Sequence, residues 1–303
     1  MARVSTPPVP AGNGKVPPSS HPIQLPVPTV LKLLRIGFRI GGRVSPMLAG
    51  RIAYALWFKP TRSKAPAGEQ KYLESARIEQ LDIHPHTITT YAWGQSGPVV
   101  LLVHGWSGRG TQLGAFAKPL LDAGYRVIAF DAPAHGKSSG KKTNIYEIAD
   151  VIVSLQHHYG EFDSIITHSF GGPSTALALN RGLKTKRMVS ISPPATTRWL
   201  VDKFLSVLRI PERAGLNMMK RFETEFGSNI WEDVSMINAI KDVTVPGLLI
   251  HDSNDEDVPF QNGQAVADAW TSASFIKTTG LGHRRILRDK TVIDSVVRFV
   301  NER

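Results

Sequence analysis

The chain of 303 residues contains no cysteine, which excludes disulfide bonds and thiol-based redox chemistry and suits a reducing compartment such as the cytoplasm. Acidic residues are absent from residues 1–68, which hold ten Lys and Arg, so most of the net charge of +11 belongs to this segment. The rest of the chain carries 26 basic and 25 acidic residues. An enzyme that acts on nucleic acid is expected to carry positive charge around its working surface, so we expect no nucleic-acid partner.

Long apolar runs are also missing. Residues 1–28 hold eight of the 21 Pro and lack the apolar segment of a secretory signal, so we expect a disordered, partly extended tail. The next stretch, residues 29–58, is apolar, but a basic residue interrupts it every few positions. This pattern argues against a transmembrane helix. No group of His, Asp and Glu has the spacing of metal ligands, and we expect neither a metal nor a cofactor.

Residues 29–60 predict a basic amphipathic helical extension. Its basic residues recur at steps of three and four with apolar residues between them, at Lys32, Arg35, Arg39 and Arg43. Gly41-Gly42 and Pro46 are expected to end the first helix, and residues 49–58 predict a second one. Two interpretations of residues 29–58 remain open. The helices pack on the rest of the chain with their Arg residues in solvent, or they lie on an anionic membrane.

The most informative segment is residues 165–172, Ile-Ile-Thr-His-Ser-Phe-Gly-Gly. A short apolar run leads to Ser169, and an Ala-rich segment of helical character follows. This pattern predicts a strand, a very sharp turn and a helix, with the hydroxyl of Ser169 at the tip of the turn. Small residues are needed at Gly171 and Gly172 because the strand and the helix pass close to each other there. The usual pattern is G-x-S-x-G, and Thr167 replaces its first Gly.

A serine hydroxyl attacks a carbonyl at neutral pH only if a histidine takes its proton and an acid orients that histidine. Downstream, residues 245–250 predict a buried strand that runs into an acidic loop containing Asp252, Asp255 and Asp257. Residues 273–278 predict a last strand, and His283 follows it closely. A purely structural hydrogen bond in its loop is the alternative role for His283.

The order Ser, Asp, His, with each residue in a loop after a strand, is the order found in α/β-hydrolases. Two more segments resemble this family, and the resemblance runs from about residue 76 to the C-terminus. Residues 98–106, Pro-Val-Val-Leu-Leu-Val-His-Gly-Trp, resemble the strand and His-Gly turn that bear half of the oxyanion hole. Residues 126–138 resemble the next strand and its D-x-x-G-H-G-x-S loop, with Ala134 in place of one Gly.

The resemblance implies specific roles for individual residues. Family spacing favours Asp255 over Asp252 and Asp257 as the acid. The implied catalytic triad is Ser169, Asp255 and His283, and the backbone N–H groups of Trp106 and Phe170 are the implied oxyanion hole. His104 and His135 lie beside Gly in turns and are expected to be buried hydrogen-bonding residues rather than bases.

The remaining chain predicts an α/β fold, namely a mostly parallel twisted sheet with helices on both faces. Strands are expected at 76–83, 87–93, 99–103, 126–130, 164–168, 187–191, 246–250 and 273–278, the first two antiparallel. Helices are expected at 111–123, 144–159, 171–181, 260–271 and 290–301. We assign residues 70–303 to an α/β-hydrolase domain, and the resemblance makes residues 195–243 its helical cap.

The cap offers a large apolar surface and no charge preference, since residues 195–243 contain seven basic and seven acidic residues. Its large apolar residues are Trp199, Phe204, Leu205, Leu208, Met218, Met219 and Phe222. They either line a substrate pocket or pack the cap on the core. An apolar pocket favours an ester, thioester or lactone with an apolar acyl part over a sugar or a phosphate.

Relatives that open epoxides or displace halide use an Asp nucleophile, so a Ser indicates acyl transfer. The resemblance implies a serine hydrolase that forms a covalent acyl-enzyme, with a carboxylic ester as substrate. Amidases, small peptidases and hydrolases of C–C bonds use the same machinery and stay open as alternatives. So do a non-catalytic binding protein of the same fold and a membrane-associated interaction protein. The sequence does not indicate the oligomeric state.

Overall fold

The computed structural model describes residues 29–302, and the predicted tail at residues 1–28 lies outside the described residues. Eight strands form one twisted sheet in the order β1-β2-β4-β3-β5-β6-β7-β8. The strands are β1 Arg77–Ile83, β2 His86–Trp93, β3 Val99–Val103, β4 Arg126–Phe130, β5 Phe162–His168, β6 Thr185–Ile191, β7 Gly247–Asp252 and β8 Ala273–Thr278. The first strand pairs antiparallel with β2, and β2 pairs antiparallel with β4, whereas all other neighbours are parallel. The predicted α/β fold is confirmed.

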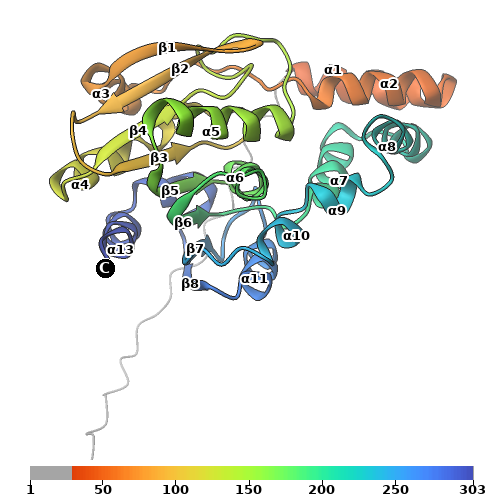
Figure 1. Cartoon of the computed structure of the whole chain (residues 1–303). Coiled ribbons are helices and arrows are strands. Elements are labelled where there is room, and N and C mark those ends of the chain that lie inside the picture. The colour runs from red at the N-terminus through yellow and green to blue at the C-terminus, as the bar shows by residue number, and fades with distance from the viewer. Residues whose placement is uncertain (1–28, 303) are drawn as a thin grey trace, which may run out of the picture.

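Helices cover both faces of this sheet (Figure 1). The helices that accompany the sheet are α3 Ala67–Ser75, α4 Ala117–Asp122, α5 Ile145–Tyr159, α6 Gly171–Leu179, α11 Phe260–Ala269, α12 Gly282–Arg285 and α13 Lys290–Asn301, with 3-10 turns η1 Gly110–Phe116 and η2 Ile286–Arg288. Alternate residues of a strand serve opposite faces. Leu101 packs in the core cluster that contains α5, while Val100 and Leu102 pack in the cluster that contains α4 and α13. Both faces of the central strands are therefore apolar, as parallel sheets require.

Two predicted helix boundaries of α5 follow from local chemistry. The side chain of Asn144 accepts a hydrogen bond from the N–H of Glu147 at 3.0 Å and so caps the start of the helix. Gly160 ends it with a φ of +86°. Helix α13 begins at Lys290, as predicted. The side chain of Asp289 caps this start by accepting hydrogen bonds from the N–H groups of Thr291 and Val292.

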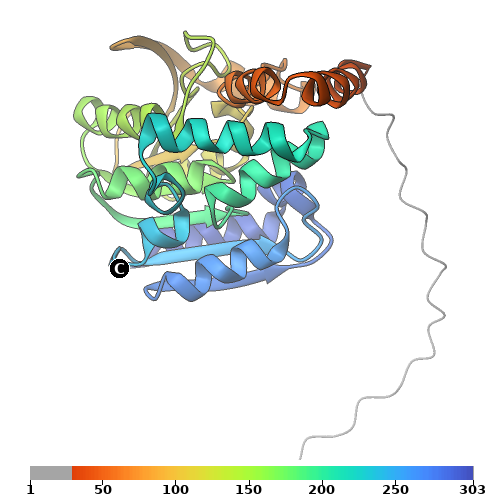
Figure 2. The ribbon, with the colours of Figure 1, turned by 90° about the vertical axis from the view of Figure 1, so that its right-hand side faces the viewer.

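Four helices lie between β6 and β7, in the segment expected to form a cap. They are α7 Thr197–Leu208, α8 Glu212–Phe226, α9 Ile230–Asp233 and α10 Met236–Ile240. Figure 2 shows α7 and α8 beside a further pair of helices from the start of the described chain, α1 Thr29–Val44 and α2 Pro46–Trp57. These two helices pack on α7 and α8, so residues far apart in the sequence form one helical layer.

The prediction that Gly41-Gly42 end the first helix is wrong, because α1 continues through them to Val44. Glycine disfavours a helix by only about 1 kcal/mol, and burial of a helix face outweighs that preference. Gly42 is buried, and a Cβ atom there would lie 2.7 Å from Cγ of Pro211, so the close helix contact requires this glycine. The break falls at Ser45, whose side chain accepts a hydrogen bond from Leu48 N–H and caps α2.

Candidate active site

Ser169 lies in the sharp turn between β5 and α6. Its φ is +51°, a left-handed conformation that costs a non-glycine residue about 1–3 kcal/mol and is often found at functional sites. The carbonyl of Ile191 on the neighbouring strand accepts a 2.9 Å hydrogen bond from the Ser169 N–H and holds the turn in place. A Cβ atom at Gly171 would lie 2.6 Å from the Val103 carbonyl oxygen, which confirms the need for a small residue there.

Thr167 occupies the position where the usual turn pattern has its first glycine. Its side chain is fully buried, and its hydroxyl donates a 3.1 Å hydrogen bond to the carbonyl of Val189 on β6. The hydroxyl is therefore paired inside the sheet, and the threonine fits the strand without disturbing the turn.

His283 and Asp255 form a direct pair in the loops that follow β8 and β7. The Nδ1 atom of His283 lies 2.8 Å from Oδ2 of Asp255. The other carboxylate oxygen accepts hydrogen bonds from the backbone N–H groups of Asp257 and Val258, at 2.9 and 2.8 Å. Burial opposes ionisation of Asp255, but the hydrogen bonds from His283 and Val258 outweigh it and hold its pKa below the ordinary value. An ionised Asp255 fixes the proton of His283 on Nδ1 and leaves Nε2 free to accept one.

The other two carboxylates of the acidic loop do not pair with His283. Asp257 is about half exposed and lies 3.9 Å from the guanidinium of Arg284. Asp252 is fully buried, and its Oδ2 accepts hydrogen bonds from the Thr278 hydroxyl and the Leu281 N–H. It thereby ties the end of β7 to the segment that leads to His283. The sequence pattern marks Asp252 only as a competitor of Asp255 and does not indicate this positioning role.

The loops of Ser169 and His283 are joined through His168. Its Nε2 donates a 2.9 Å hydrogen bond to the backbone carbonyl of His283, and the two rings lie 4.6 Å apart. Burial, aided by the nearby His283, lowers the pKa of His168 to about 3, so this ring is neutral at pH 7. No hydrogen bond among the described residues joins the Ser169 hydroxyl to His283. Such bonds are often long in free enzymes and shorten when substrate binds.

The turn after β3 lies against Ser169. A Cβ atom on Gly105 would lie 2.9 Å from Cβ of Ser169 and 3.4 Å from its hydroxyl oxygen, so the two turns are in contact. Trp106 follows this turn, and its ring meets that of Phe170 edge-on with 5.4 Å between centroids. Within residues 29–302, the backbone N–H groups of Trp106 and Phe170 donate to no other protein group. Both predicted oxyanion-hole residues therefore flank Ser169 with available donors.

His104 and His135 stabilise this turn through hydrogen bonds, and neither acts as a base for Ser169. Nε2 of His104 accepts a 3.0 Å hydrogen bond from Ala132 N–H, and Nε2 of His135 accepts one of 3.0 Å from Ser107 N–H. Burial lowers the pKa of His104 to about 4 and that of His135 to about 3. Their predicted role as buried hydrogen-bonding residues is confirmed.

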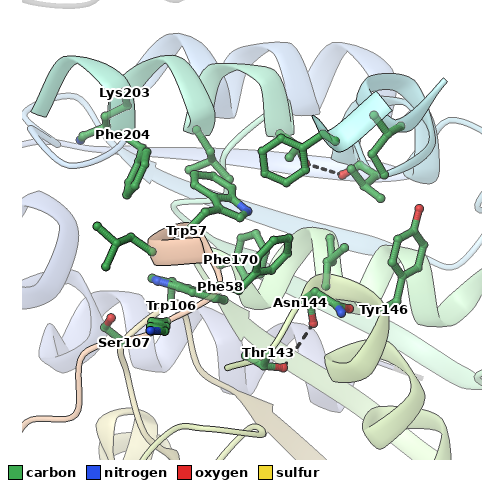
Figure 3. A pocket seen from close by; sticks show the side chains of 18 of the residues that line it. Trp57, Phe58, Trp106, Ser107, Thr143, Asn144, Tyr146, Phe170, Lys203 and Phe204 are labelled. Atoms are coloured by element: carbon green, nitrogen blue, oxygen red, sulfur yellow. Dashed lines mark hydrogen bonds between the residues drawn. The ribbon is translucent and has the colours of Figure 1, made fainter. Parts of the chain in front are cut away.

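A cavity of about 420 Å³ opens at Ser169, between the sheet and the helical layer. Figure 3 shows Trp57, the last residue of α2, and Phe58, which follows it, in the wall of the cavity near Trp106 and Phe170. Its apolar lining consists of Leu56, Trp57, Phe58, Trp106, Ile145, Phe170, Leu200, Phe204, Val207, Leu208, Phe222, Phe226, Ile230, Trp231 and Val234. The lining also includes Ser107, Thr143, Asn144 and Lys203. This volume falls within the range of pockets that hold small organic ligands.

Sequence reasoning identified the cap side of this cavity only in part. Three of the seven expected cap residues line it, namely Phe204, Leu208 and Phe222. Met218 is instead buried in the core cluster, and Leu205 and Met219 pack against that cluster. The sequence pattern did not single out six further apolar cap residues that line the cavity, namely Leu200, Val207, Phe226, Ile230, Trp231 and Val234. It also did not indicate the wall outside the cap, where Leu56 and Trp57 end α2 and Phe58 follows it. That cluster of large apolar side chains just before Lys59 was the available signal.

Within residues 29–302, no group of three or more His, Asp or Glu side chains could hold a metal ion. None of the helices in this described part combines the length and the apolar character that a bilayer-spanning helix needs.

Residues 100–294 match the model of the alpha/beta hydrolase family, which is most of the chain. The chain belongs to this family. A non-heme chloroperoxidase, CPO-A1 of Kitasatospora aureofaciens, is 32% identical over 110 residues, covering 34% of this chain and 39% of that protein. The AB hydrolase superfamily protein YfhM of Bacillus subtilis (strain 168) is 27% identical over 139 residues, covering 39% of this chain and 47% of that protein. The matches thus span less than half the length of these curated relatives.

Solved structures show the same fold. Mouse alpha/beta hydrolase domain-containing protein 10 superimposes with a TM-score of 0.60 at 18% identity, covering 75% of this chain and 97% of that chain. An esterase from Exiguobacterium antarcticum superimposes with a TM-score of 0.57 at 16% identity, covering 72% of this chain and 96% of that chain. The thioesterase domain from the curacin biosynthetic pathway superimposes with a TM-score of 0.56 at 19% identity, covering 74% of this chain and 98% of that chain.

Proposed function

We propose that this α/β-hydrolase is a serine hydrolase that cleaves carboxylic esters or thioesters with an apolar acyl part through a covalent acyl-enzyme. The observation that carries the proposal is the apolar cavity, which is lined by Ser169 in its strained turn and by Trp106 and Phe170, whose backbone N–H groups make no hydrogen bond within residues 29–302. An acyl chain in this cavity would present its carbonyl carbon to the Ser169 hydroxyl. The esterase and thioesterase among the structural neighbours share the fold and make such chemistry plausible.

In the proposed reaction, the Ser169 oxygen attacks the carbonyl carbon while Nε2 of His283 takes its proton. Asp255 keeps the other ring proton on Nδ1 and stabilises the imidazolium that forms. The N–H groups of Trp106 and Phe170 bind the oxyanion of the tetrahedral intermediate, and one such donor typically contributes about 10²–10³ in kcat. Collapse of the intermediate expels the alcohol or thiol, which receives the proton from His283. Water then attacks the acyl-enzyme with His283 as base and releases the acid.

Labelling with a fluorophosphonate probe tests this proposal, because the probe reacts only with an activated serine beside an oxyanion hole. We expect one modified residue, Ser169, identified by mass spectrometry of the digested protein. The Ser169→Ala variant is the control and is expected to remain unlabelled with an unchanged melting temperature. Labelling at another serine, or none in a folded protein that also fails to cleave p-nitrophenyl esters, would contradict the proposal.

A further inference from the structure

The α1–α2 helix pair has one face packed on the protein. Phe38, Ala53 and Tyr54 are buried, and the ring of Tyr54 lies 4.7 Å from that of Phe222 on α8. Arg35 adds a 2.8 Å hydrogen bond from its Nε to the carbonyl of Val207 on α7. The two helices are therefore an integral part of the helical layer, and this face is not available to a partner.

Both helices also carry large apolar side chains that are open to solvent. These side chains are each between 47% and 82% exposed and comprise Val30, Leu33, Ile36, Ile40, Val44, Met47, Leu48 and Ile52. Only three other large apolar residues of the described chain are comparably exposed, namely Ile78, Val207 and Leu216. On α1, the turn of 100° per residue places Ile36 and Ile40 opposite the buried Phe38. We call these eight residues the exposed apolar face. Gathered apolar surface of this kind on a soluble protein marks an interaction site.

Positive charge borders this face. Lys32, Arg39 and Arg43 follow one another along α1, between its buried and exposed sides, and all three are exposed. None of them lies within ion-pair distance of an acidic group of the described chain, and no Asp or Glu precedes Glu69. A second copy of the chain would bring the same basic row against itself. An anionic lipid surface instead offers apolar and negatively charged contacts together.

We propose that the exposed apolar face of α1–α2 docks on the surface of an anionic lipid bilayer. The apolar side chains would enter the boundary between headgroups and acyl chains, and the basic row would meet the headgroups. Docking there would bring an acyl substrate near the cavity, because Trp57 at the end of α2 and Phe58, which follows it, line the cavity. That consequence rests on the proposed function, whereas the docking itself does not.

Co-sedimentation of the full-length protein with lipid vesicles tests the docking. We expect binding to vesicles of equal parts phosphatidylcholine and phosphatidylglycerol, and much less to phosphatidylcholine alone. Binding should weaken strongly at about 1 M salt, where charges are screened within ~3 Å. The Ser169→Ala variant should bind as the wild type does, which keeps this test independent of any hydrolytic activity.

Two pairs of variants distinguish the effect of the exposed apolar face and its basic row from the effect of similar residues elsewhere on the protein. Ile36→Ser/Ile40→Ser should lower vesicle partitioning by about tenfold or more per residue, whereas Ile78→Ser/Leu216→Ser removes comparably exposed apolar residues elsewhere and should not. The charge reversals are Lys32→Glu/Arg39→Glu/Arg43→Glu, with Lys141→Glu/Lys241→Glu/Arg298→Glu as the control of equal net charge. The first set should lower partitioning by at least about fivefold per residue, and the control by far less.

Three results would overturn the docking proposal. One is a wild type that does not sediment with anionic vesicles at low salt. Another is an equal loss of binding in the control variants, which would indicate that net charge or non-specific hydrophobic adsorption causes the binding. The third is a concentration-dependent dimer in analytical ultracentrifugation, without lipid, that Ile36→Ser/Ile40→Ser dissociates, since a second copy would then be the occupant. Melting temperatures close to that of the wild type confirm that each variant is folded.

Discussion

The three carboxylates of the loop after β7 allow a test with matched variants, because each makes different contacts within a few residues. In Asp255→Asn, the amide oxygen can still accept hydrogen bonds from the N–H groups of Asp257 and Val258, as the carboxylate does at 2.9 and 2.8 Å. The amide NH₂ would then face Nδ1 of His283 where Oδ2 now lies at 2.8 Å. Two donors cannot pair, so His283 must move its proton to Nε2 and can no longer accept one from Ser169.

We expect kcat for a p-nitrophenyl ester to fall by about 10⁴ in Asp255→Asn, which corresponds to ~5.4 kcal/mol of lost transition-state stabilisation. Asp257→Asn is the surface control, since this side chain is about half exposed, and its kcat should stay within about twofold of the wild type. Asp252→Asn places an NH₂ group against the Leu281 N–H, so it should lower the melting temperature as well as kcat.

Steady-state kinetics and thermal melts of the three variants show which of the three carboxylates orients His283. A kcat within about tenfold of the wild type in Asp255→Asn, or the largest loss in Asp257→Asn, would refute the proposed role of Asp255. A loss in Asp252→Asn that equals that of Asp255→Asn at an unchanged melting temperature would show that Asp252 acts in the chemistry rather than in positioning.

Three further outcomes follow from the cavity, the nucleophile and the buried histidines. Ser169→Ala should reduce kcat by several orders of magnitude while leaving the melting temperature unchanged within a few degrees, and residual activity within about tenfold would refute the role of Ser169. The value of kcat/KM should rise from acetate to hexanoate esters by up to ~0.8 kcal/mol per methylene, about fourfold each, and a flat series would contradict an acyl site in the apolar cavity. Burial holds the pKa values of His104 and His135 at about 4 and about 3, below the ordinary 6.5, so the unfolded chain binds more protons. The melting temperature should therefore fall as pH drops through about 6.5 towards 4, and a constant value over that window would contradict neutral buried rings.

The sequence predicted the sheet and the turn that holds Ser169 because their signals are local. A strand of apolar residues followed by a turn of small residues fixes the position of Ser169 within a few residues of chain. Parallel strands bring their carboxyl ends to one edge of the sheet, so the turn of Ser169 and the loops of Asp255 and His283 lie at the same edge. The pairing of His283 with Asp255 rather than Asp252 depends on loop geometry, which the sequence alone did not define.

Contacts between distant segments were not predictable. Nothing local indicates that Trp57 would line a cavity with Phe204, although their rings meet edge-on with 5.4 Å between centroids. Likewise, Glu69 is buried against Arg109 at 2.7 Å and near Arg288, and it holds the start of α3 to the turn before η1. Such ion pairs join residues between 40 and 219 positions apart, so no periodic pattern reveals them.

The α1–α2 pair shows why the two interpretations of residues 29–58 do not exclude each other. A helix has room for a buried side and an exposed side, and α1 buries Phe38 while Ile40, two residues later, is 61% exposed. Removing the whole segment would therefore disturb the cavity wall as well as the outer surface, and loss of activity in such a truncation would not distinguish the two roles. Point changes do distinguish them. Trp57→Ala alters the cavity and should change kcat/KM for long acyl esters without affecting vesicle binding, and Ile36→Ser/Ile40→Ser should do the reverse with a soluble substrate. If both changes altered both properties equally, the inner and outer faces of the pair would not be independent.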